Sequence, residues 1–333
     1  MANPDAIDVI CLGETLVDFL PEQPGMKVRD VRRWVRCSGG SPANVSVGVA
    51  RLGGSSAMVG VVGQDEFGEF LLEALSNEGV DVARLRQTDE GKTGLVFISL
   101  TAGGDRSFMF SRTRSAELFL AERDVDPAYL ERARALHFGT NSLLFREAQR
   151  AMVRAVRAGA AGGKIVSCDP NLRLNFWPDP ADLKGVLDAL LPSCTLVKLS
   201  EEEIAFVTGK STPEAALEHL SSLGVSLPIV TLAERGAVFL WKGRTVSVAA
   251  PAVQVLDTTG AGDGFVAALL FSLTRLYPDR AALLQAGVGE LRELAQFACA
   301  VGSRVTEALG AVDSLPRISE LGGVLPNRLH PTP

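Results

Sequence analysis

Apolar runs of strand length alternate with segments of helical periodicity along most of the chain. The apolar runs predict strands over 7–13, 56–63, 164–170, 194–200, 227–232, 236–241 and 244–250. Apolar residues spaced three or four apart predict helices over 42–52, 65–80, 146–159, 181–191 and 201–209, with two more before the C-terminus. Such alternation is typical of a mainly parallel sheet with helices on both faces, so the expected fold class is α/β.

Two segments do not fit this alternation. The chain is polar and rich in arginine from the end of the first strand to about Cys37, and residues 93–112 are typical of a hairpin that turns at Gly103 and Gly104. We expect segments near 14–37 and 91–115 to form a small β lid. No repeat, linker or low-complexity run divides the sequence, so residues 1–333 are expected to form a single domain.

The amino-acid composition and net charge limit the kinds of molecule that the protein can be expected to bind. The 333 residues are 47% hydrophobic, and the formal net charge of −6 comes without a basic block, which argues against a nucleic-acid binder and favours small molecules. The N-terminus lacks a signal-like pattern and no window reaches about 18 apolar residues, so neither secretion nor membrane insertion is expected. The five cysteines form no CxxC pair, which favours reduced thiols in the cytoplasm.

The stretch DTTGAGDGFVAALL, residues 257–270, combines bare backbone with the start of a helix. Its apolar residues recur at helical spacing, so the first N–H groups of the helix face back over Gly260 to Gly262. Such amides bind anions, and Gly260, Ala261 and Gly262 would let a phosphate approach closely. Asp263 could take a proton from a hydroxyl that attacks phosphorus, or it could only cap the helix.

Two competing glycine motifs are weaker. GKST at 209–212 ends like a phosphate-binding P-loop, but Ile204 stands where that loop needs a glycine, and the stretch follows a helix. TGAGDG lies late in the chain and lacks the G-x-G-x-x-G spacing of dinucleotide-binding folds. The first stretch is therefore interpreted as a turn, and a Rossmann dehydrogenase is disfavoured.

A second cluster of small residues precedes the helix expected at 42–52. Ser41 can cap that helix, and Asn44 would project its amide from the first turn. Gly39 and Gly40 would let a polyol come against the backbone while Asn44 bonds to its hydroxyls. The alternative is a turn and a cap alone. Asp18, which follows an apolar strand, is ambiguous by itself.

Polar residues also follow two of the later strands. Side chains at the C-terminal edges of parallel strands tend to face ligands, so Asp169, Asn171 and Arg173 are candidate site residues. Arg173 could bind substrate oxygens or phosphate through its fork of donors, or it could form a surface salt bridge. Ser200 and Glu203 match a capping box, which explains both residues by local structure alone.

Three of these stretches together resemble the ribokinase-like family of carbohydrate kinases, also called the PfkB family. They are GGSPANVSVGVARLGG, DPNLR and DTTGAGDGFVAALL, and their order and spacing match over nearly the whole chain. GDRSFMFSRTRSAEL and DPNLRLNFWPD are most similar to sugar-site segments of fructokinases. The resemblance implies a three-layer α/β/α sandwich with a mainly parallel central sheet and a small β lid. It also implies ATP-dependent phosphoryl transfer to a hexose hydroxyl, with D-fructose as the first expectation.

The resemblance further implies roles for individual residues. Asp263 would be the general base, and the transferred phosphoryl group would be held by Gly260, Ala261 and Gly262, with Arg173 nearby. The sugar would be bound by Asp18, Gly39, Gly40, Asn44, Arg112, Asp169 and Asn171. ATP would lie along Lys198, Ser200, Glu203, Thr231, Gly236 and Cys299. Mg²⁺ would be held mainly through water and ATP oxygens, the lid would exclude water, and a homodimer could form through the lids.

The sequence departs from the usual family pattern at three positions. Ser200 replaces the usual Asn, a change shared with plant-type fructokinases, Ala233 replaces Gly, and Cys299 replaces a common Asn. The nearest rival is a 2-keto-3-deoxygluconate kinase, whose relatives engage the substrate carboxylate with Tyr and Arg around the lid. The segment FMFSRTRSA has no Tyr, although Arg112 and Arg114 could serve an anion. A non-catalytic fructokinase-like scaffold is a third alternative, against which the intact TGAGD stretch argues.

Asp257 lies six residues before Asp263 in the same loop, where an uncompensated carboxylate would oppose ATP binding. The resemblance implies a monovalent cation there, K⁺, held by Asp257, Thr259, Gly310 and Ser314. The alternative is an Asx-turn between Asp257 and the loop backbone. Asp313, in the same late loop, is an extra acid without an assigned role.

Overall fold

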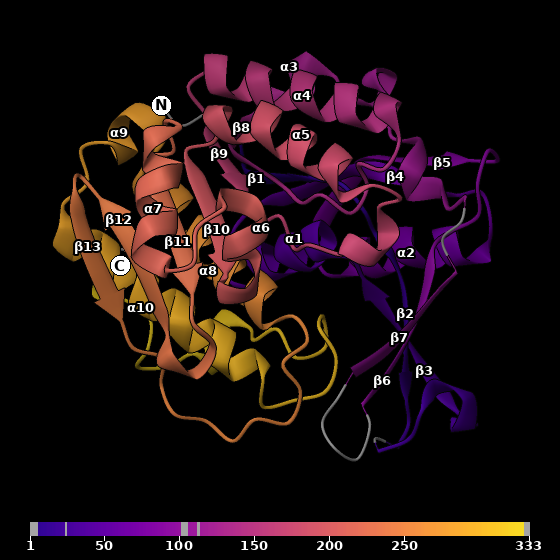
Figure 1. The fold of residues 1–333 in the computed structure, drawn as a ribbon. Helices are drawn as coiled ribbons and strands as arrows, with labels where there is room; N and C mark the ends of the chain where they lie inside the picture. The colour runs from indigo at the N-terminus through magenta and orange to yellow at the C-terminus, as the bar shows by residue number, and fades with distance from the viewer. Residues whose placement is uncertain (1–5, 24, 101–105, 112–113, 330–333) are drawn as a thin grey trace.

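The computed structural model describes residues 6–23, 25–100, 106–111 and 114–329. Its larger sheet consists of β1 (Ile7–Leu12), β4 (Ser56–Gly63), β5 (Val80–Thr88), β8 (Ala133–Phe138), β9 (Ile165–Cys168), β10 (Leu196–Ser200), β11 (Leu227–Thr231), β12 (Ala237–Trp241) and β13 (Arg244–Val248). The strand order is β13-β12-β11-β10-β9-β8-β1-β4-β5 (Figure 1). Strands from β5 to β11 pair in parallel, and β12 and β13 add an antiparallel edge.

Helices cover both faces of this sheet. One face packs against α1 (Ser41–Arg51), α2 (Glu66–Asn77), α8 (Ala261–Leu276), α9 (Arg280–Leu283) and α10 (Val288–Val305). The other face packs against α3 (Pro127–Leu130), α4 (Arg146–Ala161), α5 (Pro180–Leu190), α6 (Ile204–Thr208) and α7 (Pro213–Ser222). The predicted α/β/α sandwich with a mainly parallel sheet is therefore confirmed. None of the helices described is both long and apolar enough to cross a membrane.

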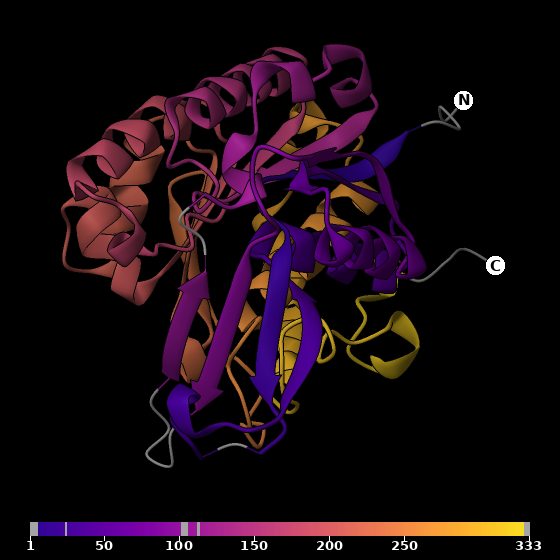
Figure 2. The same cartoon turned by 90° about the vertical axis from the view of Figure 1, so that its right-hand side faces the viewer.

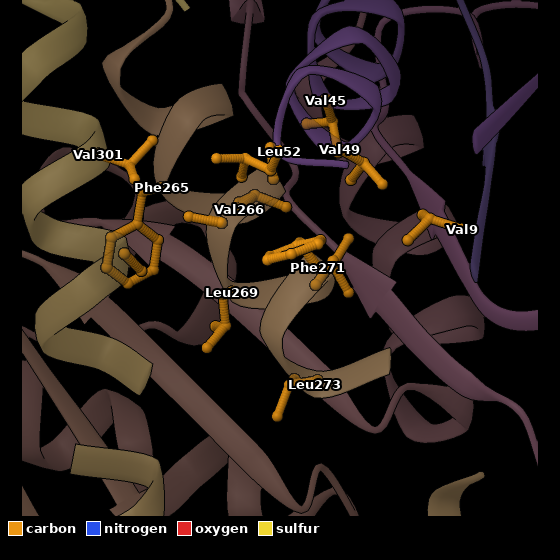
Figure 3. Close-up of a cluster of buried hydrophobic side chains, with 14 of the residues drawn as sticks. Val9, Val45, Val49, Leu52, Phe265, Val266, Leu269, Phe271, Leu273 and Val301 are labelled. Atoms are coloured by element: carbon orange, nitrogen blue, oxygen red, sulfur yellow. The ribbon is translucent and has the colours of Figure 1, made fainter. Parts of the chain in front are cut away.

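Helix α8 is the most deeply buried helix around the candidate site. Residues 263–274 are all buried, and Phe265, Val266 and Leu269 pack among side chains of α1 and α10 (Figure 3). Glycines let the helices approach, since a Cβ at Gly48 of α1 would lie 2.5 Å from Ala267 Cβ. A helix enclosed on all sides is held rigidly, so its N-terminus has a fixed position at one edge of the sheet.

A second sheet of four strands projects from this body (Figure 2). Its order is β3-β2-β6-β7, with β2 (Leu16–Pro21), β3 (Trp34–Gly39), β6 (Leu95–Leu100) and β7 (Arg106–Ser111). The β2–β6 pair is parallel and the other two pairs are antiparallel. These strands, called the lid below, come from the two segments expected to form a small sheet. The turn expected at Gly103 and Gly104 lies outside the described residues, and the single-domain assignment stays a prediction.

The sequence pattern did not predict strands β5 and β8. Strand β8 lies between β1 and β9, yet it contains Arg134 and His137, which break its apolar run. Arg134 donates to Asp8 and to the Thr274 carbonyl, both near 3 Å, and the buried His137 ring lies 3.1 Å from Ser167 Oγ. Because those partners come from other elements, the local pattern could not reveal the strand.

Candidate active site

A cavity of about 470 Å³ lies between the lid and the C-terminal ends of the parallel strands. The predicted residues that line it are Asp18, Gly40, Asn44, Asp169, Asn171, Arg173, Lys198, Ser200, Glu203, Thr259, Gly260, Gly262 and Asp263. Other predicted residues lie outside its lining, namely Gly39, Thr231, Gly236, Asp257, Ala261, Cys299, Gly310 and Ser314. Arg112 lies outside the described residues. The structure therefore brings together most of the proposed sugar and phosphate residues.

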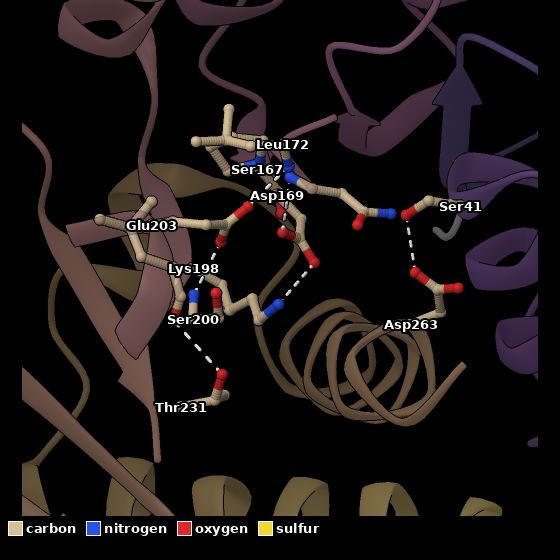
Figure 4. Close-up of polar contacts among 12 residues, drawn as sticks. Ser41, Ser167, Asp169, Leu172, Lys198, Ser200, Glu203, Thr231 and Asp263 are labelled. Atoms are coloured by element: carbon tan, nitrogen blue, oxygen red, sulfur yellow. Dashed lines mark hydrogen bonds and ion pairs between the residues drawn. The ribbon is translucent and has the colours of Figure 1, made fainter. Parts of the chain in front are cut away.

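Asp263 lies in the first turn of α8 and is 7% exposed. Ser41 Oγ donates to its Oδ1 at 2.6 Å (Figure 4), and Asn44 Nδ2 donates to its Oδ2 at 2.8 Å. Burial raises the pKa of Asp263 to about 6, and these two hydrogen bonds limit the rise. The carboxylate is therefore ionised near pH 7 and fixed in orientation by α1.

The cap expected at Ser41 and the alternative that Asp263 only caps its helix are both wrong. The N-cap of α8 is Gly260, so Asp263 does not cap that helix. The N-cap of α1 is Gly40, and the Ser41 hydroxyl points to Asp263 instead of its own helix. Ser41 is therefore a site residue that the sequence interpretation assigned to local structure. Its partner is 222 residues away, so no local signal could have revealed the contact.

The start of α8 forms an anion nest, defined here as the backbone of Gly260, Ala261 and Gly262. Gly260 has φ 80°, and a Cβ there would lie 2.8 Å from Ala311 Cα. A Cβ at Gly262 would lie 3.0 Å from Lys198 Nζ. Glycine is therefore favoured at both positions. The N–H groups of the first turn of α8 lie beside the buried ammonium group of Lys198.

Lys198 reaches this nest from β10. Its Nζ lies 2.9 Å from Asp169 Oδ2, and both residues are buried (Figure 4). Burial opposes the charge on Lys198, but Asp169 and Glu203 outweigh it and raise the pKa of the lysine. The ammonium group therefore stays protonated, and the pair points a donor with positive charge at the place where a phosphate would lie.

The segment after β9 is held by the side chain of Glu203 and by that of its own Asp169. Glu203 accepts from Ser200 N–H and from Leu172 N–H, both at 2.7 Å. The first bond belongs to the expected capping box, whereas the second, which joins the two strand ends, was not expected. Asn171 has φ 45°, and its N–H donates to Asp169 Oδ1 at 3.3 Å. Arg173 follows this fixed backbone and lines the cavity.

Asn141 and Glu14 were not predicted as site residues. Both line the cavity, and Asn141 Nδ2 donates to Glu14 Oε1 at 3.4 Å and to the Asn171 carbonyl at 3.3 Å. Glu14 follows β1 and Asn141 follows β8, so both stand at C-terminal strand ends. Asn141 could not be recognised because strand β8 was not predicted. Glu14 could have been recognised, because it stands just after the predicted first strand.

Asp18 faces the cavity from the lid. Burial raises its pKa to about 7, the nearby Asp263 carboxylate adds to the rise, and Arg173 opposes it. A Cβ at Gly39 would collide with this carboxylate, and Gly40 has φ 102° with Glu14 O 2.5 Å from a Cβ position. The two glycines therefore allow lid and body backbone to approach each other around Asp18.

The lid also supplies an apolar wall. Leu16, Val96, Ile98 and Phe110 line the cavity opposite the polar residues of the body. The Phe110 ring meets Phe176 of the body edge to face, with centroids 4.3 Å apart. A cavity with one polar and one apolar side suits a small polyhydroxylated molecule that is covered on one face.

Comparison with known proteins identifies the family. Residues 6–318 match the model of the pfkB family of carbohydrate kinases. The chain belongs to this family. It is 36% identical over 314 residues to a fructokinase-2 from Solanum habrochaites, with 94% of each chain covered. The fructokinase from Xylella fastidiosa, solved with bound ATP, superposes with a TM-score of 0.88 at 31% identity, covering 97% and 98% of the two chains.

A second solved neighbour shows the range of substrates on this fold. The aminoimidazole riboside kinase from Salmonella enterica, solved with its riboside and an ATP analogue, has a TM-score of 0.81 and 28% identity. The match covers 95% of this chain and 98% of that one. The chain is thus an ATP-dependent carbohydrate kinase, and ATP and a small sugar are its substrates.

Three residues expected along ATP have structural partners outside the cavity. Thr231 Oγ1 donates to the Leu199 carbonyl at 3.3 Å. Gly236 has φ 95° and lies directly against the Val248 carbonyl. Cys299 is buried in α10, and burial raises its pKa to about 12. These contacts explain why each residue fits its position, and the nucleotide-binding roles stay predictions.

Asp257 joins two loops beneath the nest. Its Oδ1 accepts from the N–H and Oγ1 of Thr259, at 3.0 and 2.7 Å, which is the Asx-turn given above as the alternative to a cation site. Its Oδ2 accepts from Gly310 N–H at 3.1 Å. Ser314 Oγ donates to the carbonyls of Gly310 and Ala311. The four residues proposed for a cation therefore belong to one connected cluster.

Proposed function

We propose that this kinase transfers the γ-phosphoryl group of ATP to a hydroxyl of D-fructose, giving fructose 6-phosphate, with Asp263 as the general base. One observation carries the proposal. Asp263 is held by Ser41 and Asn44 in the first turn of the helix whose glycines form the anion nest. A base fixed beside an anion site suits a hydroxyl that attacks phosphorus.

The chemistry assigned to each group follows from its position. Asp263 takes the proton of the sugar hydroxyl as the new O–P bond forms and the bond from the γ-phosphorus to the bridging oxygen of ADP breaks. The N–H groups of the nest stabilise the charge on the transferred group, and Lys198 adds a positive charge beside it. Arg173, which lines the cavity near Asp18, lies where sugar and phosphate meet. Mg²⁺ would be held mainly by ATP oxygens and water.

The sugar would lie against Asp18 and the lid. Asp18 accepts sugar hydroxyls, with Gly40 and Asn171 beside it and Asp169 fixed behind them by Lys198. Asn44 uses one of its two Nδ2 hydrogens on Asp263, and its buried Oδ1, which has no partner among the described residues, is left to accept from a sugar hydroxyl. Neutral hydroxyls suit these acceptors, and the fructokinases among the relatives support fructose.

A sugar acid is the second candidate, with Arg112 or Arg114 as the proposed partner of its carboxylate. Arg112 lies outside the described residues, and Arg114 is exposed and stacks on Phe119 at 5.6 Å from the ring centroid, away from the cavity lining. Its position favours the neutral sugar. A non-catalytic scaffold is disfavoured because the base and both nest glycines are present.

A sugar panel tests the substrate. ADP formation is measured with fructose, glucose, ribose and 2-keto-3-deoxygluconate at fixed ATP and Mg²⁺. Fructose is expected to give the highest kcat/KM. A clear preference for the acid would transfer the assignment to a sugar-acid kinase, and no turnover with any sugar would favour the scaffold.

We also propose activation by K⁺ at the cluster of Asp257, Thr259, Gly310 and Ser314. A buried carboxylate with nearby hydroxyl and carbonyl oxygens offers the hard ligands that such cations prefer. Initial rates in potassium, sodium and a bulky organic cation at equal ionic strength test it, with the highest rate expected in potassium. Equal rates would remove this part of the proposal and leave the kinase assignment intact.

Three further proposals concern the setting of the enzyme. The lid is proposed to close over the sugar and exclude water. The test is the rate of ATP hydrolysis measured without sugar.

The five buried free cysteines support a reducing compartment such as the cytoplasm, which cell fractionation tests. Exposed Val35 and Met109 on the lid support a homodimer through the lids, which sedimentation tests.

A further inference from the structure

The loop over residues 310–314, called the late loop, contacts the lid on one side. The Cys37 thiol of β3 donates to Asp313 Oδ2 at 3.3 Å. Leu20 of β2 packs so closely on Gly310 that a Cβ there would lie 2.8 Å from Leu20 Cδ1. Two lid strands therefore touch the late loop, although they are more than 270 residues away from it in the sequence, with 276 between Cys37 and Asp313.

The other side of the late loop contacts the anion nest. Gly310 N–H donates to Asp257 Oδ2 at 3.1 Å, and Ala311 lies against Gly260. Ser314 Oγ donates to the carbonyls of Gly310 and Ala311 at 2.5 and 2.9 Å, which holds the loop in one shape. Movement of the late loop would therefore displace the backbone of the anion nest, because the two are in direct contact.

Cys37 lies next to the sugar pocket. It stands opposite Asp18 in the β2–β3 ladder, so the two side chains share one face of the lid, on which Asp18 lines the cavity. The thiol is 8% exposed. Burial, followed by the Asp313 carboxylate, raises its pKa to about 12, so it remains a protonated donor at neutral pH. A bond from this donor to a carboxylate is charge-assisted.

We infer that Cys37 and Asp313 are positioning residues that link occupancy of the sugar pocket to the geometry of the anion nest. The inference rests on the proposed positions of the sugar at Asp18 and the phosphoryl group at the nest. When the bound sugar holds the lid in one position, the Cys37–Asp313 bond holds the late loop in place. The late loop in turn holds the backbone of Gly260 in place. Sugar and nucleotide then each raise the affinity for the other by the same factor.

Calorimetric titration of the full chain measures this factor. The probe is fructose, or whichever sugar of the panel has the highest kcat/KM, titrated without and with a saturating non-hydrolysable ATP analogue and Mg²⁺. Cys37→Ala and Asp313→Ala are each expected to lower the coupling factor about 2–12-fold, the range of one hydrogen bond. The double variant is expected to lose no more than either single variant. Cys37→Ser, which keeps a donor, is expected to restore most of the coupling.

Arg36→Ala is the matched control. Arg36 precedes Cys37 but faces the other side of β3, where its guanidinium lies 3.8 Å from the Phe70 ring centroid on α2. It joins lid and body away from the late loop, so its removal is expected to leave the coupling factor unchanged. Because Asp313 is exposed, its variant tests the contact even if Cys37→Ala fails to fold.

Several outcomes would overturn the inference. They are a wild-type coupling factor of one, an unchanged factor in Asp313→Ala, an additive loss in the double variant, or an equal loss in Arg36→Ala. The proposed function is decided separately, because the sugar panel and the turnover of the wild type do not depend on the coupling factor.

Discussion

The body and the lid differ in how much apolar surface holds each together. Two large clusters of buried side chains fill the two faces of the main sheet. Among the described residues of the lid, Leu16, Val96 and Ile98 form a small buried cluster of their own, with Leu20 and Phe110 partly buried beside them. So small a core cannot hold a sheet alone. The position of the lid is therefore set by its contacts with the body and with ligands.

The two acids of the site follow the same division. Asp263, on the body, accepts two short hydrogen bonds, and burial raises its pKa to about 6. Asp18, on the lid, has no hydrogen-bond donor among the described residues, and burial raises its pKa to about 7. The proposed base is thus oriented without a substrate, whereas we expect Asp18 to gain hydrogen-bond donors from the sugar that is proposed to bind there.

The largest effect is expected from removing the body acid. Asp263→Asn should lower kcat about 10²–10⁴-fold while sugar and ATP binding are largely retained, because the loss falls on proton transfer. Asp279→Asn, the same change at an aspartate that caps α9, should leave kcat unchanged. Steady-state kinetics with fructose decide it, and an active Asp263→Asn enzyme would refute the mechanism.

A smaller but still large effect is expected at the nest. Gly260→Ala places a side chain at φ 80° and against Ala311. It should lower the free energy of unfolding by more than the roughly 1–2 kcal/mol that a left-handed backbone alone costs. It should also lower kcat at least tenfold. Gly243→Ala is the matched control, since Gly243 has φ 74° with nothing within 4 Å of a Cβ. It should lose similar backbone stability in thermal unfolding while kcat stays unchanged. Equal kcat losses in both would remove the special role of the nest.

A pair of core truncations tests the difference in packing directly. Leu270→Ala in the body should lower the free energy of unfolding by about 2–5 kcal/mol. Ile98→Ala in the lid should lower it by at most about 1 kcal/mol, because the lid opens locally at low free energy, but should raise KM for the sugar. Denaturant unfolding and kinetics measure both. A global loss of several kcal/mol in Ile98→Ala would show that lid and body unfold as one unit.

The smallest effect concerns stability against pH. The folded pKa of Asp18, about 7, exceeds the ordinary value of 3.8, so its contribution to stability is present at low pH and lost as pH rises through 7. The melting temperature of Asp18→Asn relative to wild type should therefore rise between pH 4 and pH 8. Asp65→Asn should show the opposite slope, confined to pH values below about 5, because hydrogen bonds from Thr93 and Gly68 overcome burial and lower the pKa of Asp65 from its ordinary value of 3.8. Parallel slopes would contradict the assignment.

Local signals predicted much of the body and some of the site. The glycines and the aspartate at the start of α8 could be recognised because nest, helix start and base are adjacent in the sequence. Strand alternation likewise predicted the parallel sheet. Strand β8 escaped because Arg134 and His137 are paired by residues from other elements.

Residues whose partners are distant in the chain could be interpreted only in part. Ser41 was assigned to a helix cap, and the bond that holds Asp169 to Lys198 was not expected, although the sugar-binding role of Asp169 stays a prediction. Asp18 was ambiguous until the lid placed it at the cavity. Glu203 has one local and one distant partner. Its bond to Ser200 is local and could be predicted, whereas its bond to Leu172 joins distant parts of the chain and could not.

The bond from Ser41 to Asp263 also has a consequence for biosynthesis. The two residues are 222 positions apart, so at about 5–20 residues per second the ribosome adds the second roughly 10–45 s after the first. During that interval α1 lacks α8, the helix it packs against, and no phosphoryl transfer is available to the nascent chain. Translation that stops before residue 263 therefore releases a product without the proposed base, so we expect prematurely terminated chains not to consume cellular ATP through this site.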